Sequence, residues 1–444
     1  MDLAWISLAA LLVVIVVSCT TTVNAGMLAI VLAWVIGVYV APLCGKTIGM
    51  KGVVAGFPAD LFLTLVGVTL LFTLAQANGT LDRVARSAVQ SCRGNVGLIP
   101  VMFFFLAFGL ASIGPGNIAA AALLAPMAMA LAERAGISAF LMTLMVAHGA
   151  VAGALSPLAP TGIIARDRMA DIGLVGFGMQ TYLYNLLANA LVAFAGYFIF
   201  GGWLLFGRRF VDSHADEFSG IAPRETSGVE TAAGTASGNG FQLQNQVTLG
   251  TIVVLVAAVI GCKIGLGREL HVGMAAFVAS IVLILFRIGG EKEAMRMMPW
   301  GVMIMVCGVT VLTSLLDQTG GMDRMSDLVA SVSNSRSVTG VIALVAGLVS
   351  VYSSTSGVVL PAFLPMTPGL VQRLAGSDAL AIASSINVGG HLVDVSPLST
   401  IGALCIASAS ASVDRRKLFN KVLAWGLSMS VAGALFCYLF FGLL

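Results

Sequence analysis

The stretch FLAFGLASIGPGNIAAAALLAP, residues 105–126, decides the fold of this chain together with a second stretch, LVSVYSSTSGVVLPAFLP, residues 348–365. Both are apolar and long enough to enter a bilayer, and both are interrupted in the middle by glycine and by hydroxyl or amide side chains. Lipid tolerates such an interruption only where the freed backbone groups face protein or a cavity. Two interruptions at matching places in the two halves of one chain indicate the binding site of a secondary transporter.

The composition places the chain in a membrane. Of its 444 residues, 58% are hydrophobic and 10% are charged, whereas a soluble domain carries about 25% charged residues. The seven cysteines include no CxxC pair and do not suggest a disulfide framework, and the net charge of +3 does not indicate nucleic acid as a partner. Residues 3–23 read as a transmembrane helix rather than a signal peptide, because the only charge before them is Asp2.

The chain repeats itself at a constant offset of 241 residues. The matching positions are Gly67-Val68-Thr69 with Gly308-Val309-Thr310, Asp82-Arg83 with Asp323-Arg324, Ser112 with Ser353, and Gly116 with Gly357. Gly26-Met27 also matches Gly273-Met274, at a slightly different offset. A constant offset over a stretch of about 50 residues predicts two homologous halves.

Apolar runs of about 20 residues predict five transmembrane helices and one re-entrant hairpin in each half. Five crossings are an odd number, so the second half is inverted in the membrane relative to the first. We therefore predict an all-α polytopic membrane protein built as an inverted repeat. The basic residues favour both termini outside, since the larger share of them then falls in inner loops, whereas Arg166 and Arg168 fall in an outer loop.

The predicted divisions follow the repeat. They are early helices in residues 1–80, a hairpin, broken helix and last helix in 81–206, a flexible cytoplasmic linker in 207–246, and the corresponding parts of the second half in 247–320 and 321–444. The linker is expected to be flexible because it is rich in Gly, Ser and Thr. The amphipathic segments 81–90 and 322–332 have the charge spacing of helices that lie along the membrane surface.

The tips of the two hairpins are the predicted substrate site. Unpaired N–H groups at a helix N-terminus attract an anion, and glycine lets the backbone approach it closely. The tip residues are Ser112, Gly114, Gly116 and Asn117 in the first hairpin, and Ser353, Ser354, Thr355 and Ser356 in the second. Neither tip contains arginine or lysine, so backbone and hydroxyl groups are expected to recognise the anion. The alternative is that these small residues only allow helices to pack closely.

A long apolar run follows each hairpin, residues 137–165 and 379–411, and each contains Ser-Pro-Leu, at Ser156 and at Ser396. Proline lacks an N–H and frees a carbonyl one turn back, so we expect both helices to break there. Freed carbonyls beside hydroxyls are ligands for Na⁺ in broken-helix transporters. Thr161 and Thr400, beside the breaks, are added to the substrate site. The candidate ion ligands are Ser112, Asn117, His148, Gly149, Ser156, Ser354, Asn387 and Ser396.

Asp394 is the one acid that lies deep in an apolar run. An acid at the centre of a membrane helix costs about 2.5–3.5 kcal/mol on insertion scales, so Asp394 is expected to face protein or water. It could bind a coupling cation or a proton. His391, one helical turn away, is a second coupling candidate, although His391 and His148 could equally form structural hydrogen bonds.

At these residues the sequence resembles a known family. The tip at residues 114–117, GPGN, and the break at 156–162, SPLAPTG, resemble MatC-type malonate/dicarboxylate carriers. The wider plan is similar to the divalent-anion/sodium symporter family of the ion transporter superfamily, whose hairpins carry a Ser-Asn-Thr motif. Residues 353–355 match that motif with Ser in the middle place, whereas the first tip keeps only Ser112, with Asn117 displaced.

The resemblance implies a homodimer with an elevator mechanism, in which hairpins and broken helices form a transport domain that moves against scaffold helices. It favours import of a small dicarboxylate, above all malonate, with Na⁺, in a bacterial inner membrane. A proton-coupled carrier of C4-dicarboxylates and an inorganic-anion or arsenite exporter are the alternatives. Moving a dianion inward against 100 mV costs about 4.6 kcal/mol, so uptake needs accompanying cations. An enzyme is disfavoured because Asp394 has no catalytic partner of the Ser-His-Asp kind.

Overall fold

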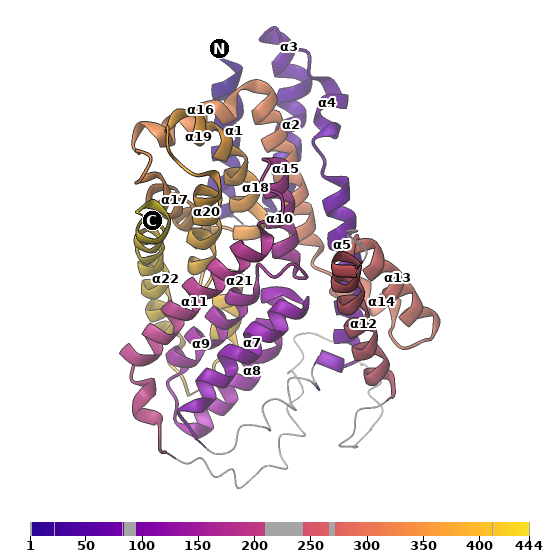
Figure 1. The fold of residues 1–444 in the computed structure, drawn as a ribbon, viewed down its shortest axis with the longest axis vertical. Coiled ribbons are helices and arrows are strands. Elements are labelled where there is room, and N and C mark those ends of the chain that lie inside the picture. Colours follow the sequence, from indigo (N-terminus) through magenta and orange to yellow (C-terminus); the bar gives the residue numbers. More distant parts are fainter. Residues whose placement is uncertain are drawn as a thin grey trace.

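The structure is a computed structural model of the chain, and it describes residues 2–21, 23–81, 83, 95–208, 243–265, 271–410 and 412–443. These residues form helices joined by short connections, with no β-strand among them. The predicted all-helical fold is therefore confirmed (Figure 1).

The first half is built from α-helices and two short irregular helical turns. They are α1 (Leu3–Thr20), α2 (Ala25–Val35), η1 (Ile36–Val40), α3 (Ala41–Leu43), α4 (Gly49–Ala55), α5 (Ala59–Ala77), α7 (Leu98–Ile113), α8 (Gly116–Ala135), α9 (Ala139–Gly153), α10 (Pro160–Asp171), α11 (Gly178–Ile199) and η2 (Gly202–Leu205).

The second half repeats this order, with one further described helix, α16, before its hairpin. It contains α12 (Leu243–Gly265), α13 (Val272–Leu285), α14 (Glu291–Met297), α15 (Trp300–Thr319), α16 (Gly321–Ser331), α17 (Val338–Tyr352), η4 (Thr355–Val359), α18 (Leu360–Phe363), η5 (Leu364–Met366), α19 (Thr367–Arg373), α20 (Ala379–Val393), α21 (Thr400–Ala407), α22 (Arg415–Cys437) and η6 (Tyr438–Gly442).

The offset of 241 residues carries over from the sequence to the helices. Shifting α5 by this offset gives residues 300–318, and α15 covers Trp300–Thr319. Shifting α9 gives residues 380–394, and α20 covers Ala379–Val393. The repeat also includes the short helices α4 and α14, which the apolar pattern did not predict because each has only seven residues.

The two halves interlock through glycines. A Cβ atom on Gly308 of α15 would lie 2.2 Å from the carbonyl oxygen of Gly26 on α2. In the matching crossing, a Cβ atom on Gly67 of α5 would lie 2.2 Å from the carbonyl oxygen of Gly273 on α13. Only glycine permits backbones to approach this closely. The glycines that repeat in the sequence are thus the points where the helices of one half cross those of the other.

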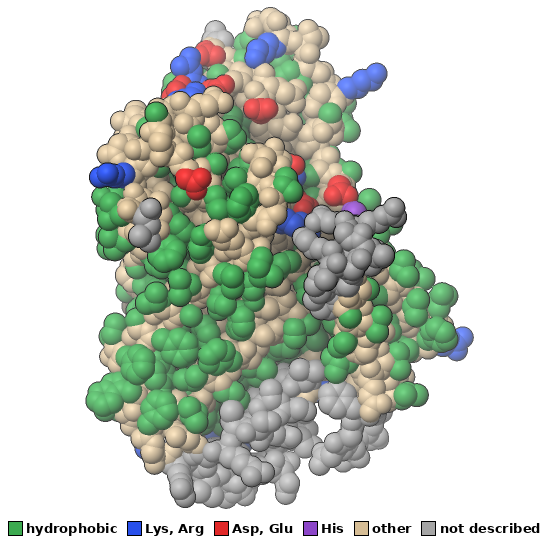
Figure 2. Space-filling model, viewed as in Figure 1, with side chains coloured by type: hydrophobic (Ala, Val, Ile, Leu, Met, Phe, Trp, Pro, Cys, Tyr) green, Lys and Arg blue, Asp and Glu red, His purple; other side chains and the backbone are tan. Residues whose placement is uncertain are grey.

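Helix length and hydrophobicity fit a membrane protein. Six helical segments of the described chain are long and apolar enough to cross a bilayer, namely Ala25–Leu43, Ala59–Ala77, Gly116–Ala135, Gly178–Ile199, Trp300–Thr319 and Arg415–Gly442. Shorter apolar helices include α7, α9, α17 and α20, which belong to the hairpins and broken helices. Figure 2 shows hydrophobic side chains over much of the visible face, with charged ones gathered towards the upper end.

One predicted boundary changes. The linker was predicted to end at residue 246, but α12 begins at Leu243. Most of the linker, residues 209–242, and most of the predicted helix at 81–90 lie outside the described residues. The helix predicted at 322–332 is confirmed as α16.

Candidate functional site

The first interrupted stretch forms a helical hairpin. Helix α7 ends at Ile113, and α8 begins at Gly116 after the turn Gly114-Pro115. Gly114 has φ = 146°, and a Cβ atom there would lie 1.9 Å from the ring of Phe72 on α5. Glycine is therefore required at this tip both for its backbone conformation and for the contact with α5.

The second interrupted stretch also forms a hairpin, with a different tip. Helix α17 ends at Tyr352, and Ser353 and Ser354 are extended. The Ser354 hydroxyl accepts a hydrogen bond from the backbone N–H of Gly357 at 3.1 Å, so it caps the helical segment that starts at η4.

Both long apolar runs break where Ser-Pro-Leu predicts. Helix α9 gives way to α10 across Ser156, and α20 gives way to α21 across Ser396. The Ser156 hydroxyl donates to the carbonyl of Ser112 at 2.6 Å, which joins the first break to the first hairpin tip. In both breaks a glycine, Gly162 or Gly402, lies against the carbonyl oxygen of the Ser-Pro serine.

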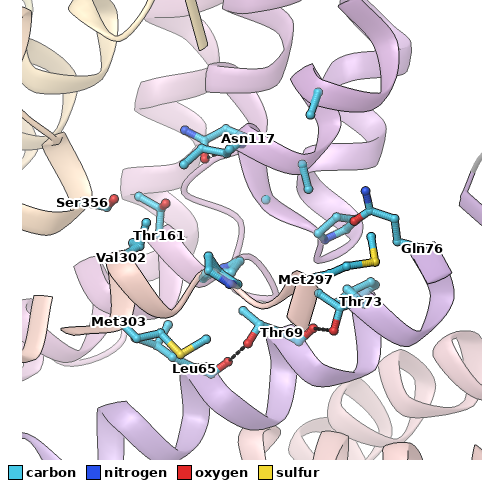
Figure 3. Close-up of a pocket in the computed structure, with 18 of the residues that line it drawn as sticks. Leu65, Thr69, Thr73, Gln76, Asn117, Thr161, Met297, Val302, Met303 and Ser356 are labelled. Atoms are coloured by element: carbon cyan, nitrogen blue, oxygen red, sulfur yellow. Dashed lines mark hydrogen bonds between the residues drawn. The ribbon is translucent and has the colours of Figure 1, made fainter. Parts of the chain in front are cut away.

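A cavity of about 240 Å³ lies where the first hairpin tip, α10, α5 and the start of α15 meet (Figure 3). Four of the predicted site residues line it: Gly116, Asn117, Thr161 and Ser356. They come from the first tip, the first break and the second tip, which are far apart in the sequence. The structure thus brings three of the four predicted interruptions to one cavity.

Sequence reasoning missed the wall opposite the hairpin tip. Helix α5, the end of α14 and the start of α15 supply the residues Leu65, Thr69, Phe72, Thr73, Gln76, Met297, Pro299, Val302 and Met303. One sequence signal for this wall is Thr69, which belongs to the repeated Gly-Val-Thr motif, but a repeated motif by itself indicates duplication and not a binding surface. Thr69, Thr73 and Gln76 lie along the face of α5 that lines the cavity, and this polar face distinguishes α5 from a purely structural helix.

The cavity offers donors on one side and acceptors on the other. Asn117 is 8% exposed, and its side-chain oxygen accepts the N–H of Ile118 at 3.0 Å. Its amide NH₂ group has no protein partner among the described residues and remains free to donate. Across the cavity, the hydroxyls of Thr69 and Thr73 donate to carbonyls of α5 at 2.6 and 2.9 Å, as Figure 3 shows. No Lys, Arg, Asp or Glu lines the cavity.

Other predicted substrate residues lie outside the cavity lining. The Ser112 hydroxyl is 2.9 Å from the Tyr182 hydroxyl, Gly114 contacts Phe72, and Ser354 caps its own hairpin. Ser353 is buried, whereas Thr400 is exposed at the start of α21 and does not line the cavity. The repeat therefore does not make Thr400 equivalent to Thr161 in its surroundings.

Asp394 joins the second hairpin to the second break. Thr355 donates to its carboxylate at 2.6 Å, and Ser350 donates to the same oxygen at 3.2 Å. The Thr355 hydroxyl is also 2.5 Å from that of Ser350 and 3.2 Å from the carbonyl oxygen of Gly390. Asp394 is 8% exposed and forms no ion pair within the described chain. These oxygens form a buried group that we call the Asp394 cluster.

The Asp394 cluster occurs in one half of the repeat. At the offset of 241, the positions of Ser350, Thr355 and Asp394 correspond to Gly109, Gly114 and Gly153. The first half thus has three glycines where the second half has two hydroxyls and an acid. The two halves share a fold, and the chemistry at this position belongs to the second half.

The two histidines differ in their surroundings. The His148 Nε2 atom accepts a hydrogen bond from the indole of Trp425 at 2.9 Å, and its Nδ1 atom lies 3.0 Å from the side-chain oxygen of Asn189. Because an indole N–H only donates, Nδ1 carries the proton, and neither ring nitrogen is free for an ion. The structure thus favours the structural interpretation of His148. Beside it, Gly149 packs against the backbone of Phe104.

His391 keeps one ring nitrogen without a partner. Its Nδ1 atom donates to the carbonyl of Asn387 at 2.7 Å, whereas Nε2 is buried with no partner in the described part of the chain. The side-chain oxygen of Asn387 is likewise buried and unpartnered there. The described residues contain no cluster of three or more His, Cys, Asp or Glu side chains that could hold a metal ion.

Comparisons with known proteins agree with this architecture. Residues 1–154 match the family model for the N-terminus of the dicarboxylate carrier protein MatC, and residues 256–444 match the model for citrate transporters. The fold is similar to that of the Alcanivorax borkumensis YdaH transporter, whose crystal structure is described as revealing an unusual topology. That match has a TM-score of 0.53 and 12% identity, and it covers 98% of each chain. No curated protein matches the sequence.

The likeness to the YdaH transporter concerns the fold alone, since the identity is low. The two family models lie one in each half of the repeat and both describe carriers of organic anions. The resemblance to MatC-type dicarboxylate carriers is therefore confirmed over residues 1–154, the second half is similar to citrate transporters, and the apolar helices make the chain a multi-pass membrane protein.

Proposed function

We propose that this protein is a secondary transporter that imports a small dicarboxylate, with malonate as the favoured substrate, by Na⁺ symport. The observation that carries the proposal is that two helix N-termini line one cavity. Gly116 and Asn117 begin α8, and Pro160 and Thr161 begin α10. Each helix N-terminus carries roughly half a positive charge. Two of them in one cavity are suited to an anion with two carboxylates.

The size of the cavity supports a small substrate. A water molecule takes about 30 Å³ in the liquid, so 240 Å³ corresponds to about eight waters. A space of this size has room for a small dicarboxylate. The Asn117 amide supplies a directional donor.

The Asp394 cluster supports the choice of coupling ion. Two hydroxyls, a carbonyl and a carboxylate are hard oxygen ligands of the kind that suit Na⁺. Ser356, which lines the cavity, is adjacent in sequence to Thr355 of the cluster. An ion bound there would offset part of the substrate charge. Asp394 without a cationic partner also favours a second candidate, a proton-coupled carrier in which Asp394 takes up the proton.

The interlocked helices support an elevator mechanism. The α2–α15 and α5–α13 crossings are held by close glycine contacts, which suits these helices to be the scaffold of a homodimer. The hairpins and broken helices would move against α5 and α15, whose faces line the cavity. In the bacterial inner membrane, both termini outside remains the expected orientation.

The test is uptake of labelled malonate into liposomes that contain the purified protein. An inward Na⁺ gradient is compared with a matched inward H⁺ gradient, and succinate, citrate and arsenite serve as competitors. Accumulation driven by Na⁺ supports the proposal, and accumulation driven only by H⁺ supports the second candidate. If malonate neither accumulates nor exchanges under any gradient, malonate is the wrong substrate. Citrate as the sole effective competitor would point to a tricarboxylate.

A further inference from the structure

Gln76 on α5 is a polar residue of the cavity lining whose side chain the protein itself does not use. It borders the cavity and is partly buried. Its side-chain amide makes no hydrogen bond to another described residue, so its N–H groups and its oxygen are available to a ligand. Thr69 and Thr73 on the same wall differ, because their hydroxyls donate to carbonyls of α5. Gln76 therefore supplies the uncommitted donors of the α5 wall.

The amides of Gln76 and Asn117 border one cavity from two different helices. The first hairpin tip touches α5 where Gly114 meets the ring of Phe72, and Gln76 follows Phe72 by four residues, one turn along α5. Asn117 lies three residues beyond Gly114, at the start of α8. Figure 3 shows Asn117 on one side of the cavity and Gln76 on α5 on the other. One small molecule in the cavity can thus meet an amide donor on each wall.

The two walls recognise an anion in different ways. On the hairpin side, the N-termini of α8 and α10 carry partial positive charge, and Asn117 adds its free NH₂ group. On the α5 side, the available group is the neutral amide of Gln76. An ionised carboxylate only accepts hydrogen bonds, so the N–H groups of Gln76 match it. The hairpin wall is suited to a first carboxylate, and Gln76 is suited to a second.

The repeat does not reproduce this α5 wall in the second half. The offset of 241 residues places Asp317 of α15 at the position of Gln76, and Asp317 is exposed and outside the cavity lining. The next residue, Gln318, is also exposed and does not line the cavity. The amide that faces the hairpin is therefore a feature of the first half, and Gln318 offers a matched glutamine away from the cavity.

We propose that Gln76 donates a hydrogen bond to the second carboxylate of the transported dicarboxylate and thereby sets the length of the dicarboxylate that the cavity accepts. This inference rests on the proposed function. The hairpin wall holds the first carboxylate through Asn117 and the backbone of α8, so the position of the Gln76 amide decides where the second carboxylate is bound. A shorter amide side chain withdraws the donor towards α5 and favours a longer substrate. A side chain without a donor leaves the second carboxylate without that hydrogen bond.

The experiment measures binding of malonate, succinate and the monoanion propionate to the purified protein in detergent. Wild type is compared with Gln76→Leu, Gln76→Asn and the matched control Gln318→Leu. We expect Gln76→Leu to weaken malonate binding by about tenfold, through loss of a hydrogen bond to a charged group, and to change propionate binding by less than about twofold. Gln76→Asn should weaken malonate binding more than succinate binding and so lower the malonate-to-succinate affinity ratio. Gln318→Leu should bind all three as wild type does.

The affinity ratios separate recognition from structural damage. Gln76→Leu removes no hydrogen bond between described residues, so we expect it to fold. A folded Gln76→Leu protein with the wild-type ratio of malonate to propionate affinity overturns the inference. If Gln76→Leu does not fold, Gln76→Asn decides: a lower malonate-to-succinate ratio supports the inference, and the wild-type ratio overturns it. Wild type that binds neither dicarboxylate contradicts the proposed function instead.

Discussion

Asn117 is the residue whose surroundings best fit a ligand-binding group. It is largely buried, its side-chain oxygen is used by the backbone of α8, and its NH₂ group is free at the cavity. A buried amide donor without a protein partner is costly unless a ligand or water satisfies it. The GPGN tip in the sequence singled out this residue. The structure adds that its NH₂ group, and not its side-chain oxygen, is available to the cavity.

Replacing Asn117 with Ala should weaken dicarboxylate binding by about tenfold to a hundredfold, because a hydrogen bond to a charged group contributes about 1.5–3 kcal/mol. The measurement is binding of labelled substrate to purified protein, with Thr400→Ala as control. Thr400 is exposed and does not line the cavity, so its variant should bind as wild type does. Equal affinities for Asn117→Ala and wild type would remove Asn117 from the site.

Replacing Asp394 with Asn keeps an oxygen that Thr355 can bond and removes the charge. We expect the protein to fold and to lose its dependence on the coupling cation. The measurement is the Na⁺ and pH dependence of uptake. Asp378→Asn is the control, because Asp378 is an exposed helix cap and Asn caps equally well. An unchanged Na⁺ and pH profile in Asp394→Asn would assign Asp394 a structural role.

At the scale of the element, the hairpins and breaks are local features. Gly114, Pro157 and Pro397 interrupt helices through their own backbone chemistry, so the interruptions could be predicted from the sequence. Their surroundings could not, because Phe72, which the first tip touches, lies on another helix. The tip is therefore both a turn and a contact with α5.

A Gly114→Ala substitution should disrupt the first hairpin. The added Cβ atom would overlap the Phe72 ring at 1.9 Å on a backbone with φ = 146°, so we expect loss of uptake and a lower unfolding temperature. Gly109→Ala on α7 is the matched control, because nothing lies within 4 Å of its added atom. It should be neutral or stabilise by about 0.4–1 kcal/mol. Both are measured by thermal unfolding and uptake, and a fully active Gly114→Ala would contradict the described tip.

At the scale of the whole molecule, the two halves form one interlocked body. Helix α2 of the first half crosses α15 of the second, and α13 of the second half crosses α5 of the first, each through a glycine pair. Neither half can therefore pack in this way alone. The cavity forms at the same interface, with walls from both halves. Duplication thus created the crossings, whereas divergence created the Asp394 cluster on one side.

The two crossings should be equally sensitive to substitution. Gly67→Ala and Gly308→Ala would each place an atom 2.2 Å from a facing carbonyl oxygen, so both should lower the unfolding temperature by a similar amount. Gly250→Ala on α12 adds an atom in open space and should leave it unchanged. Thermal unfolding in detergent measures all three. A large effect in one crossing and none in the other would show that the two crossings are not equivalent.

The helical class, the repeat, the two interrupted hairpins and the two Ser-Pro-Leu breaks could all be predicted from the sequence alone. These follow from hydrophobicity, from spacing and from the backbone chemistry of glycine and proline, which act over a few residues. The packing of the helices establishes the rest: that Asn117, Thr161 and Ser356 share a cavity with α5, and that Asp394 bonds Thr355. Those pairs are separated by tens to hundreds of residues. Only the packing of helices brings them together, and a single sequence has no local signal for it.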